Sequence, residues 1–370
     1  MVFFLPDYNM GYRVASLAKS KETMERLMND GLNTIYLNDC VATLYPENLL
    51  LTRDPEILEK IHLCDEYDVF QITSSGKVFL YYSNQATDNS FFVTGKCNSN
   101  CIMCPSSDHS RKMGHMTSLP VLLELVKYIP SDAPHLTITG GEPFMMGEDI
   151  FSFFASLKGK FEYTEFLLLT NGRIFAIPEY CYLLKQTLPS KTIIGIPIHG
   201  HTPEVHDRIT RVPGSFIQTV TGLRNLIALG FYVEIRIVIS RVSAPYLEEI
   251  ASYILSEMSG IYCVKFIGLE MLGNAAKNEA EVWIPYSEAF QRAKPAITKL
   301  VVGGIDVGLY NFPLCAVDKA FWPICAKSIT DYKVKYVEQC ELCSVKDACG
   351  GIFSGTYRLA KGSIHPLMGE

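Results

Sequence analysis

Apolar stretches with strand-like and helix-like spacing alternate along most of the chain beyond residue 90. The strand candidates are Phe91–Thr94, His135–Thr139, Phe166–Thr170, Thr192–Ile198, Tyr232–Ser240 and Cys263–Leu269. The helix candidates are Ser118–Tyr128, Phe216–Leu229, Tyr246–Met258 and Tyr286–Leu300. This order indicates about six β-α units, and such alternation predicts a parallel sheet covered by helices, either open or curled into a barrel.

The two faces of the strand candidates differ in polarity. In Tyr232–Ser240 one face carries only Val and Ile, whereas the other carries Glu234 and Arg236. Lys265 likewise interrupts an apolar strand candidate. A parallel sheet with helices on both faces should be apolar throughout. The charged positions therefore favour a barrel interior that holds a ligand, and the alternative is that Glu234 and Arg236 only pair with each other.

The two ends of the chain differ from the middle in composition and in their pattern of predicted elements. Residues 1–88 contain the strand candidates Thr34–Leu37 and Lys77–Tyr82 and the helix candidate Pro55–His62, which predicts a small separate N-terminal module. Residues 89–302 form the predicted barrel. Residues 303–370 are rich in Cys, Gly and turn formers, so we expect bound metal to organise this tail.

Composition excludes several classes of protein. The 370 residues are 48% hydrophobic and only 19% charged, which is too apolar for a disordered chain. The net charge of −6 argues against a nucleic-acid binder, which normally carries a basic surface. No apolar run reaches the roughly 18–20 residues of a membrane helix. The apolar start at residues 1–7 lacks the cationic leader of a secretory signal, so we expect a cytoplasmic protein.

Twelve cysteines are unlikely partners for disulfides in a reducing cytosol. Four cysteines are scattered along the chain, and we expect each to be a small buried hydrophobic residue: Cys40, Cys64, Cys181 and Cys263. The others form two groups at metal-ligand spacing. The first group is Cys97, Cys101 and Cys104, and the second is Cys315, Cys325, Cys340, Cys343 and Cys349.

The first group has the spacing Cys-x3-Cys-x2-Cys on a single predicted loop. Three thiolates so placed can hold three irons of a four-iron cluster and leave the fourth iron open to another ligand. The alternative is a zinc site, for which His109 or His115 would be the fourth ligand.

A second motif, Gly140-Gly141-Glu142-Pro143, follows the next strand candidate. Glycines allow backbone carbonyls to approach a ligand closely, and a carboxylate beside them can accept hydrogen bonds from an ammonium group. Together with the cysteine spacing and Asn171-Gly172, this motif resembles the radical S-adenosylmethionine (radical SAM) superfamily over residues 91–300.

The resemblance implies a fold and a reaction. The fold is a partial (β/α)6 TIM-like barrel, with a [4Fe-4S] cluster at the carboxyl ends of the strands. The open iron of that cluster would bind S-adenosylmethionine (SAM), whose reductive cleavage gives a 5′-deoxyadenosyl radical that abstracts a substrate hydrogen atom. The cofactors carry this chemistry, and the protein supplies geometry and excludes water.

The resemblance also assigns site residues. Gly140–Pro143 would bind the methionine amino group of SAM, and Asn171 would lie near its ribose. Where many relatives end the fourth strand with Ser-Leu-Asp-Gly, this chain has Pro197-Ile-His199-Gly200, so His199 is either a substitute ribose contact or a strand cap. Arg236 is the candidate partner of the SAM carboxylate, and its alternative is the ion pair with Glu234.

The second cysteine group resembles the auxiliary-cluster (SPASM/Twitch) tails of peptide-modifying radical SAM enzymes. The full pattern has a further cysteine where this chain has Phe353, so five thiols remain. Five thiols are too few for two clusters with four cysteine ligands each, so we expect one auxiliary [4Fe-4S] cluster. The expected ligands are Cys340, Cys343, Cys349 and Cys315, with Cys325 as the alternative fourth ligand. A structural four-cysteine zinc site is the other interpretation.

Several further segments are similar to the HxsC branch of the His-Xaa-Ser system radical SAM maturases. They are Phe92–Pro105, Gly268–Ala275, Tyr310–Cys315, Ser328–Lys333 and Cys349–Phe353. Cys325 and the His199-Gly200-His201 loop depart from that branch. The similarity implies an enzyme that modifies a ribosomally made peptide, acting with a sister radical SAM maturase and a reductant such as flavodoxin or ferredoxin. The alternatives are a radical SAM enzyme for a small molecule or nucleotide, and a zinc scaffold without catalysis.

Overall fold

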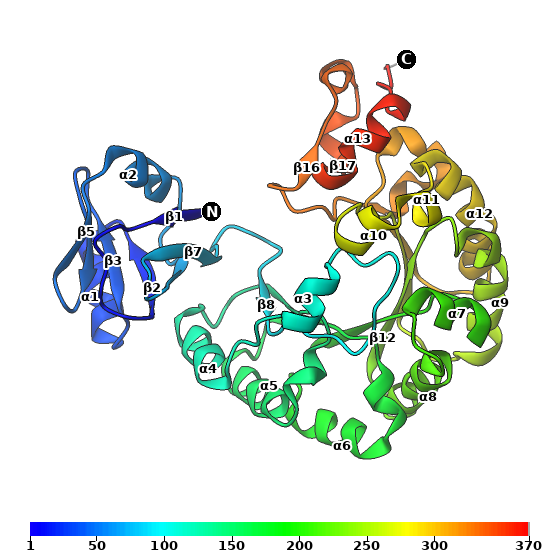
Figure 1. Cartoon of the computed structure of the whole chain (residues 1–370), viewed down its shortest axis with the longest axis horizontal. Coiled ribbons are helices and arrows are strands. Elements are labelled where there is room, and N and C mark those ends of the chain that lie inside the picture. Colours follow the sequence, from blue (N-terminus) through cyan, green and yellow to red (C-terminus); the bar gives the residue numbers. More distant parts are fainter. Residues whose placement is uncertain (369–370) are drawn as a thin grey trace.

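Two large β-sheets organise the chain, and each is built from its own stretch of sequence (Figure 1). The computed structural model describes residues 1–368. The N-terminal sheet has seven strands in the order β1-β7-β6-β2-β3-β4-β5. Its strands are β1 (Val2–Phe4), β2 (Arg13–Ala18), β3 (Thr34–Leu37), β4 (Ala42–Tyr45), β5 (Leu49–Thr52), β6 (Val69–Ile72) and β7 (Lys77–Tyr82). Helices α1 (Lys21–Asn29) and α2 (Pro55–His62) accompany it.

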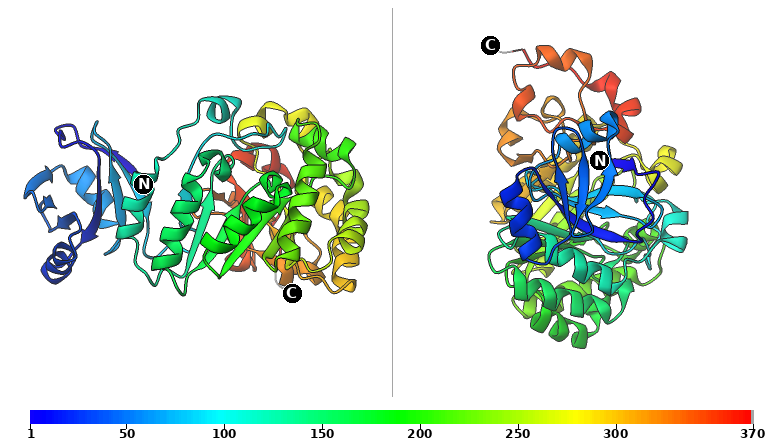
Figure 2. Two further views of the ribbon diagram at one scale, coloured as in Figure 1. Left: turned by 90° about the horizontal axis from the view of Figure 1, so that it is seen from below. Right: turned by 90° about the vertical axis from the view of Figure 1, so that its left-hand side faces the viewer.

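The second sheet consists of eight parallel strands that follow one another in sequence order. They are β8 (Ser90–Phe92), β9 (His135–Thr139), β10 (Glu165–Leu169), β11 (Thr192–Pro197), β12 (Tyr232–Val238), β13 (Cys263–Ile267), β14 (Val307–Tyr310) and β15 (Cys325–Ala326). The covering helices are α4 (Leu119–Tyr128), α5 (Asp149–Lys160), α6 (Pro178–Thr187), α8 (Ser215–Ala228), α9 (Leu247–Glu257) and α12 (Tyr286–Val302). Figures 1 and 2 show the sheet curled, with these helices outside it.

The curl explains why the strand faces differ in polarity. Ile196, Ile235 and Val264 are partners on neighbouring strands, and all three are fully buried under the helices. The alternate partners Pro197, Arg236 and Lys265 line up on the opposite, inner face. The predicted α/β fold with a partial barrel is therefore confirmed, with six β-α units from β8 to α12 followed by two further strands.

The structure adds elements that the sequence pattern did not show. Helices α5 and α6 were not predicted, and β14 and β15 extend the sheet beyond the predicted barrel end at residue 302. Strand β14 escapes detection because it has four residues and contains Gly308. A Cβ at Gly308 would lie 2.7 Å from Cδ of Lys265, so the missing side chain makes room for that lysine inside the barrel.

The tail consists mainly of turns and short 3-10 segments around the two-residue strands β16 (Val334–Lys335) and β17 (Ile352–Phe353). It rests on loops at the carboxyl ends of the barrel strands. Met271 N–H donates to Thr356 Oγ1 at 3.1 Å, and Asn311 N–H donates to Ser328 Oγ at 2.9 Å. Within residues 1–368, none of the helices combines the length and the apolar character that spanning a membrane requires.

Candidate functional site

The loop with the first three cysteines is held by several other elements. After β8, Asn100 and Ile102 donate their N–H groups to carbonyls at the end of α7 (Pro203–Thr210), at 3.1 and 2.9 Å. On the other side, Asn274 Nδ2 donates to Cys101 O at 3.0 Å, and Asn278 Nδ2 donates to Ile102 O at 2.8 Å. These bonds fix the backbone that carries the thiols.

The glycine pair after β9 packs directly against the start of this loop. A Cβ at Gly140 would lie 2.4 Å from Thr94 O, and one at Gly141 would lie 2.3 Å from Lys96 O. Gly141 N–H donates to Thr94 O at 2.7 Å, and Glu142 N–H donates to Lys96 O at 2.8 Å. The sequence suggested that the glycines allow a ligand to approach. The structure shows that they allow the cysteine loop itself to lie against the end of β9.

A cavity of about 350 Å³ opens at the carboxyl ends of the barrel strands. It brings together most of the predicted site residues: Cys97, Cys101, Cys104, Gly140, Gly141, Asn171, His199 and Arg236. Glu142 and Pro143 do not line it, and neither do His109 and His115 of the zinc alternative. In the described part of the chain, no three His, Cys, Asp or Glu side chains lie close enough together to hold a single metal ion.

The sulfur atoms of the cysteine loop have surroundings that suit an iron-sulfur cluster. Ser99 N–H donates to Cys97 Sγ and Ser106 N–H donates to Cys104 Sγ, both at 3.4 Å. Hydrogen bonds to the sulfurs are one means by which proteins tune such clusters. Burial raises the pKa of the Cys97 thiol to about 11 and that of Cys101 to about 12. The Arg111 charge opposes these shifts without cancelling them, so the thiols stay protonated, and metal ligation is what would deprotonate them.

Glu142 differs from its predicted role. Its side chain is 2% exposed, and both carboxylate oxygens accept hydrogen bonds from the chain itself. Thr170 Oγ1 donates to Oε1 at 2.8 Å, and Asn171 N–H donates to Oε2 at 2.7 Å. Burial raises the pKa of this carboxyl above its usual value, and these hydrogen bonds oppose the shift. Instead of pointing into the cavity, Glu142 joins the end of β9 to the end of β10 and so positions Asn171.

His199 lies in the cavity at the end of β11 and is 2% exposed. Its backbone N–H donates to His206 Nδ1 at 3.2 Å, while its own Nδ1 has no hydrogen-bond partner within residues 1–368. Burial, and then the neighbouring His206, hold the pKa of His199 well below its usual value. The imidazole is therefore neutral at physiological pH and can donate or accept one hydrogen bond at each nitrogen.

Arg236 is paired with Glu234 on the inner face of β12, as the alternative interpretation expected. Arg236 also lines the cavity. Gly195 on the neighbouring strand makes this possible, because a Cβ there would lie 3.1 Å from Arg236 Cδ. Arg236 thus remains within reach of the cavity while its charge is balanced by a carboxylate of its own strand.

The lining also includes residues that were not singled out as site residues, among them Arg111, Glu270, Asn311 and Phe353. Glu270, Asn311 and Phe353 lie within segments that carried the resemblance to the HxsC branch, which was the available signal. Arg111 is buried and donates to Ser106 O at 2.7 Å from the short helix α3 (Asp108–Met113). Its position depends on tertiary packing that no local motif reveals.

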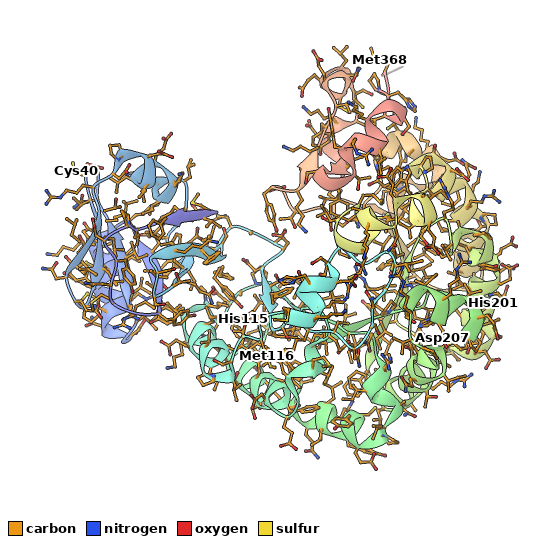
Figure 3. The ribbon with its side chains drawn as sticks, viewed as in Figure 1. Cys40, His115, Met116, His201, Asp207 and Met368 are labelled. Atoms are coloured by element: carbon orange, nitrogen blue, oxygen red, sulfur yellow. The ribbon has the colours of Figure 1, made fainter. Side chains whose placement is uncertain are left out.

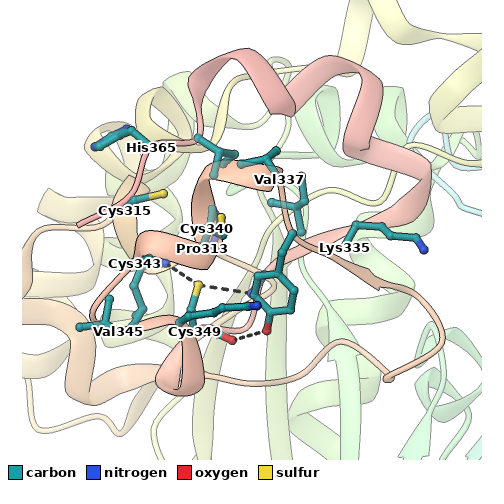
Figure 4. Close-up of a pocket in the computed structure, with 15 residues that line it drawn as sticks. Pro313, Cys315, Lys335, Val337, Cys340, Cys343, Val345, Cys349 and His365 are labelled. Carbon is teal, nitrogen blue, oxygen red and sulfur yellow. Dashed lines mark hydrogen bonds between the residues drawn. The ribbon is translucent and has the colours of Figure 1, made fainter. Parts of the chain in front are cut away.

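The tail cysteines surround a second, small enclosed cavity (Figure 4). Cys315, Cys340, Cys343 and Cys349 line it, and Cys325 does not. Backbone N–H groups again donate to sulfur: Leu314 and Gly351 to Cys349 Sγ at 3.3 and 3.4 Å, and Leu367 to Cys343 Sγ at 3.4 Å. Four thiols around one space suit a four-iron cluster, whereas a single zinc ion would need at least three of them closer together than they lie within residues 1–368.

The two cavities are neighbours. Gly351 and Ile352 line the tail cavity, and the next residue, Phe353, lines the barrel cavity. Two residues of extended chain span about 7 Å at most. Strand β17 is therefore a thin wall between the four tail cysteines and the space at the barrel mouth.

Comparisons with known proteins agree with this geometry. Residues 91–254 match the family model described as the Radical SAM superfamily. Over 191 residues the chain is 26% identical to an AdoMet-dependent heme synthase of Oleidesulfovibrio alaskensis, a match that covers 51% of this chain and 47% of that protein.

Two crystal structures of Streptococcus suis SuiB resemble the fold at 10% identity. The one bound to precursor peptide SuiA gives a TM-score of 0.50 and covers 61% of this chain and 49% of SuiB. The one bound to S-adenosylmethionine gives 0.49 and covers 60% and 50%. The chain thus matches about half the length of these relatives.

Proposed function

Because residues 91–254 match the model of the Radical SAM superfamily, we propose that this chain is a radical SAM enzyme that modifies a ribosomally made peptide. The observation that carries the proposal is the common cavity, in which three cysteines from one loop meet Asn171, His199 and Arg236 from three different strand ends. Such convergence at the carboxyl ends of barrel strands is where enzymes of this architecture place their chemistry.

The residues have separate tasks in this proposal. Cys97, Cys101 and Cys104 would hold a [4Fe-4S] cluster, and SAM bound there supplies a 5′-deoxyadenosyl radical for hydrogen abstraction. Asn171 and the neutral His199 offer hydrogen-bonding groups for the polar parts of SAM, and Arg236 offers a cation for its carboxylate. The apolar residues of the lining, among them Val238 and Leu269, keep water from the reacting atoms.

The tail would hold one auxiliary [4Fe-4S] cluster through Cys315, Cys340, Cys343 and Cys349. This arrangement supports a peptide maturase over a radical SAM enzyme with a purely structural tail, because the tail residue Phe353 lines the cavity at the barrel mouth. SuiB, one of the proteins with a similar fold, was crystallised with its precursor peptide. A sister maturase and an external reductant such as flavodoxin or ferredoxin complete the proposed system.

A second candidate is a radical SAM enzyme that acts on a small molecule. The sequence match with an AdoMet-dependent heme synthase favours it, since that match extends over 51% of this chain. The first function yields a modified peptide and the second a modified small molecule, so identifying the product decides between them.

The test is co-expression of the protein with peptides encoded near its gene, followed by mass spectrometry of the peptides. We expect a change in peptide mass that requires SAM and that disappears in Cys97→Ala, together with about eight irons per anaerobically purified wild-type chain. Cys40→Ala is the matched control. The prediction that Cys40 is buried is wrong, because it is exposed in the turn between β3 and β4 (Figure 3) and lines neither cavity. Colourless protein with stoichiometric zinc, or 5′-deoxyadenosine formation by Cys97→Ala, would refute the proposal.

A further inference from the structure

Glu270 is a cavity-lining carboxylate to which none of the tasks above assigns a role. It follows the carboxyl end of β13, and its side chain is 13% exposed. Its Oε1 atom is buried and accepts no hydrogen bond from any described residue. Lys333 Nζ lies 3.4 Å from Oε1, which is close enough for an ion pair, but its orientation does not make a hydrogen bond. The ion pair with Lys333 offsets part of the cost of burying this oxygen, and the hydrogen bond that it still lacks can be supplied by a ligand in the cavity.

The backbone on both sides of Glu270 is fixed. Thr356 Oγ1 donates to Leu269 O at 3.3 Å and accepts from Met271 N–H at 3.1 Å, and Thr356 is fully buried. Because the tail residue that makes these bonds comes three positions after Phe353, the carboxylate is held close to the tail segment that lines the same cavity. A group held by such contacts is preorganised for a ligand and does not have to be ordered on binding.

Charge in the cavity favours a cation at this position. Three charged side chains line the cavity within residues 1–368: Arg111, Arg236 and Glu270. Asp108 Oδ1 lies 2.7 Å from the Arg111 guanidinium, and Glu234 pairs with Arg236. Both cations are therefore neutralised by their own carboxylates, while Glu270 has only the incompletely oriented Lys333, which does not line the cavity. Phe353 also lines the cavity, and the face of an aromatic ring attracts a cation.

We propose that Glu270 binds a positively charged side chain of the substrate, a lysine ammonium or an arginine guanidinium, at the tail side of the cavity. This inference rests on the proposed function only in taking a peptide as the second occupant of the cavity. It assigns the peptide a basic residue near the site of modification.

The experiment measures binding to anaerobically reconstituted protein that is saturated with SAM. The probes are three acetylated, amidated hexapeptides of glycine with one lysine, norleucine or glutamate at the third position, titrated by calorimetry. We expect the lysine peptide to bind at least about tenfold more tightly than the norleucine peptide, the usual scale of one charge-assisted hydrogen bond. Equal affinities in the wild-type protein would overturn the inference without any variant.

Two variants assign the preference to one residue. In Glu270→Gln the lysine preference should fall to less than about threefold. Glu281→Gln should keep it, because Glu281 pairs with Arg208 on the surface at 3.0 Å and is the matched loss of one carboxylate. A lysine preference that persists in Glu270→Gln would contradict the inference. So would a fall in SAM affinity as large as the fall in peptide affinity, since Glu270 would then belong to the SAM site.

Failure of this inference and failure of the proposed function give different results. Protein that prefers the lysine peptide yet forms no 5′-deoxyadenosine would refute the radical function and leave the subsite in place. Protein that forms 5′-deoxyadenosine without any lysine preference would do the reverse.

Discussion

Two cysteines of the tail show how surroundings separate identical residues. The Cys315 sulfur faces a cavity that it shares with three other thiols. Cys325 does not line that cavity, and its sulfur donates to Phe321 O at 3.5 Å. A cluster held by the other three thiols would therefore have Cys315, and not Cys325, beside it. The spacing of the sequence allowed either residue, and the structure favours Cys315.

We therefore predict different iron contents for two variants. Cys315→Ala should lose the auxiliary cluster, which is about four of about eight irons, because a ligand is removed. Cys325→Ala should retain both clusters. Iron analysis and electron paramagnetic resonance of the anaerobic proteins measure this. Loss of the auxiliary signal in Cys325→Ala alone would reverse the assignment.

Individual residues also show what a sequence can and cannot predict about a site. Cys97, Cys101 and Cys104 were recognisable because their spacing is local, and a single loop fixes their relation. The direction of the Glu142 carboxylate depends on Thr170 and Asn171, which lie on the next strand, so no local pattern reveals it. The motif indicated which carboxylate follows β9, and the hydrogen bonds of that carboxylate to the next strand come only from the structure.

At the scale of elements, the barrel site depends on one close backbone approach. The chain at Thr94 and Lys96 passes so near Gly140 and Gly141 that any side chain there would meet a carbonyl oxygen at 2.4 Å or less. Backbone cannot move away as a flexible side chain does. The cysteine loop and the end of β9 are therefore one packed unit.

This packing predicts the effect of a single methyl group. Gly141→Ala should displace the cysteine loop, lower the free energy of unfolding by roughly 1–3 kcal/mol and remove most of the barrel-site iron. Gly159→Ala is the control, because its Cβ would meet nothing within 4 Å and it lies in helix α5, where alanine is favoured. Iron content and urea unfolding are the measurements. Full iron in Gly141→Ala would show that the loop can adjust.

The corner between β11 and α7 makes stability depend on pH. Burial lowers the pKa of His206 to about 4, with the Asp207 charge opposing and the Arg173 charge assisting the shift. Because this value lies below the unfolded value of 6.5, the neutral form contributes stability that is complete above pH 6.5 and is lost as the pH falls toward 4. His199 shifts in the same direction.

We predict that wild-type protein loses about 1 kcal/mol more between pH 7.5 and 5.5 than His206→Asn does. Asparagine is chosen because its side-chain oxygen can still accept the His199 N–H, so the comparison isolates the titration. Urea unfolding at the two pH values gives the difference. Equal losses in both proteins would mean that His206 is not held neutral.

Elements were predictable where their pattern was strong and self-contained. The predicted bounds of β3, β7, β9 and α2 agree with the structure, since each has a clear apolar period or a capping residue such as Asp54. Helix α5 was missed although its pattern was available, since its buried residues Ile150, Phe153, Phe154 and Leu157 recur at helical spacing. Strand β14 is short, and only its place beside β13 makes it a strand.

For the whole molecule, the decisive feature is that the tail contributes to the barrel mouth. The predicted boundary at residue 302 remains a prediction, but the chain beyond it supplies two barrel strands, the four-thiol cavity and Phe353. The sequence indicated candidate metal ligands in the tail. It gave no sign that the tail cavity and the barrel cavity share a wall.

We predict that Cys343→Ala separates SAM cleavage from peptide modification. The barrel cysteines are intact in this variant, so 5′-deoxyadenosine should still form, while the peptide co-expressed with it should keep its mass. Chromatography and mass spectrometry report the two products. Modified peptide at wild-type yield would exclude a role of the auxiliary cluster in the reaction, and insoluble protein would mean that the tail metal is needed for folding.

The shared wall has a consequence for how the protein is assembled. Strand β17 is held by its two pairing positions with β16, by the burial of Ile352 in the main core and by the bond from Ser354 N–H to Lys333 O at 2.7 Å. If a cluster occupies the four-thiol cavity, it adds a further restraint on this strand, and the barrel mouth is fully fixed only after the tail has received its iron. Cofactor insertion would then have a required order, in which a chain loaded at the barrel alone is an unfinished enzyme with an incomplete entrance.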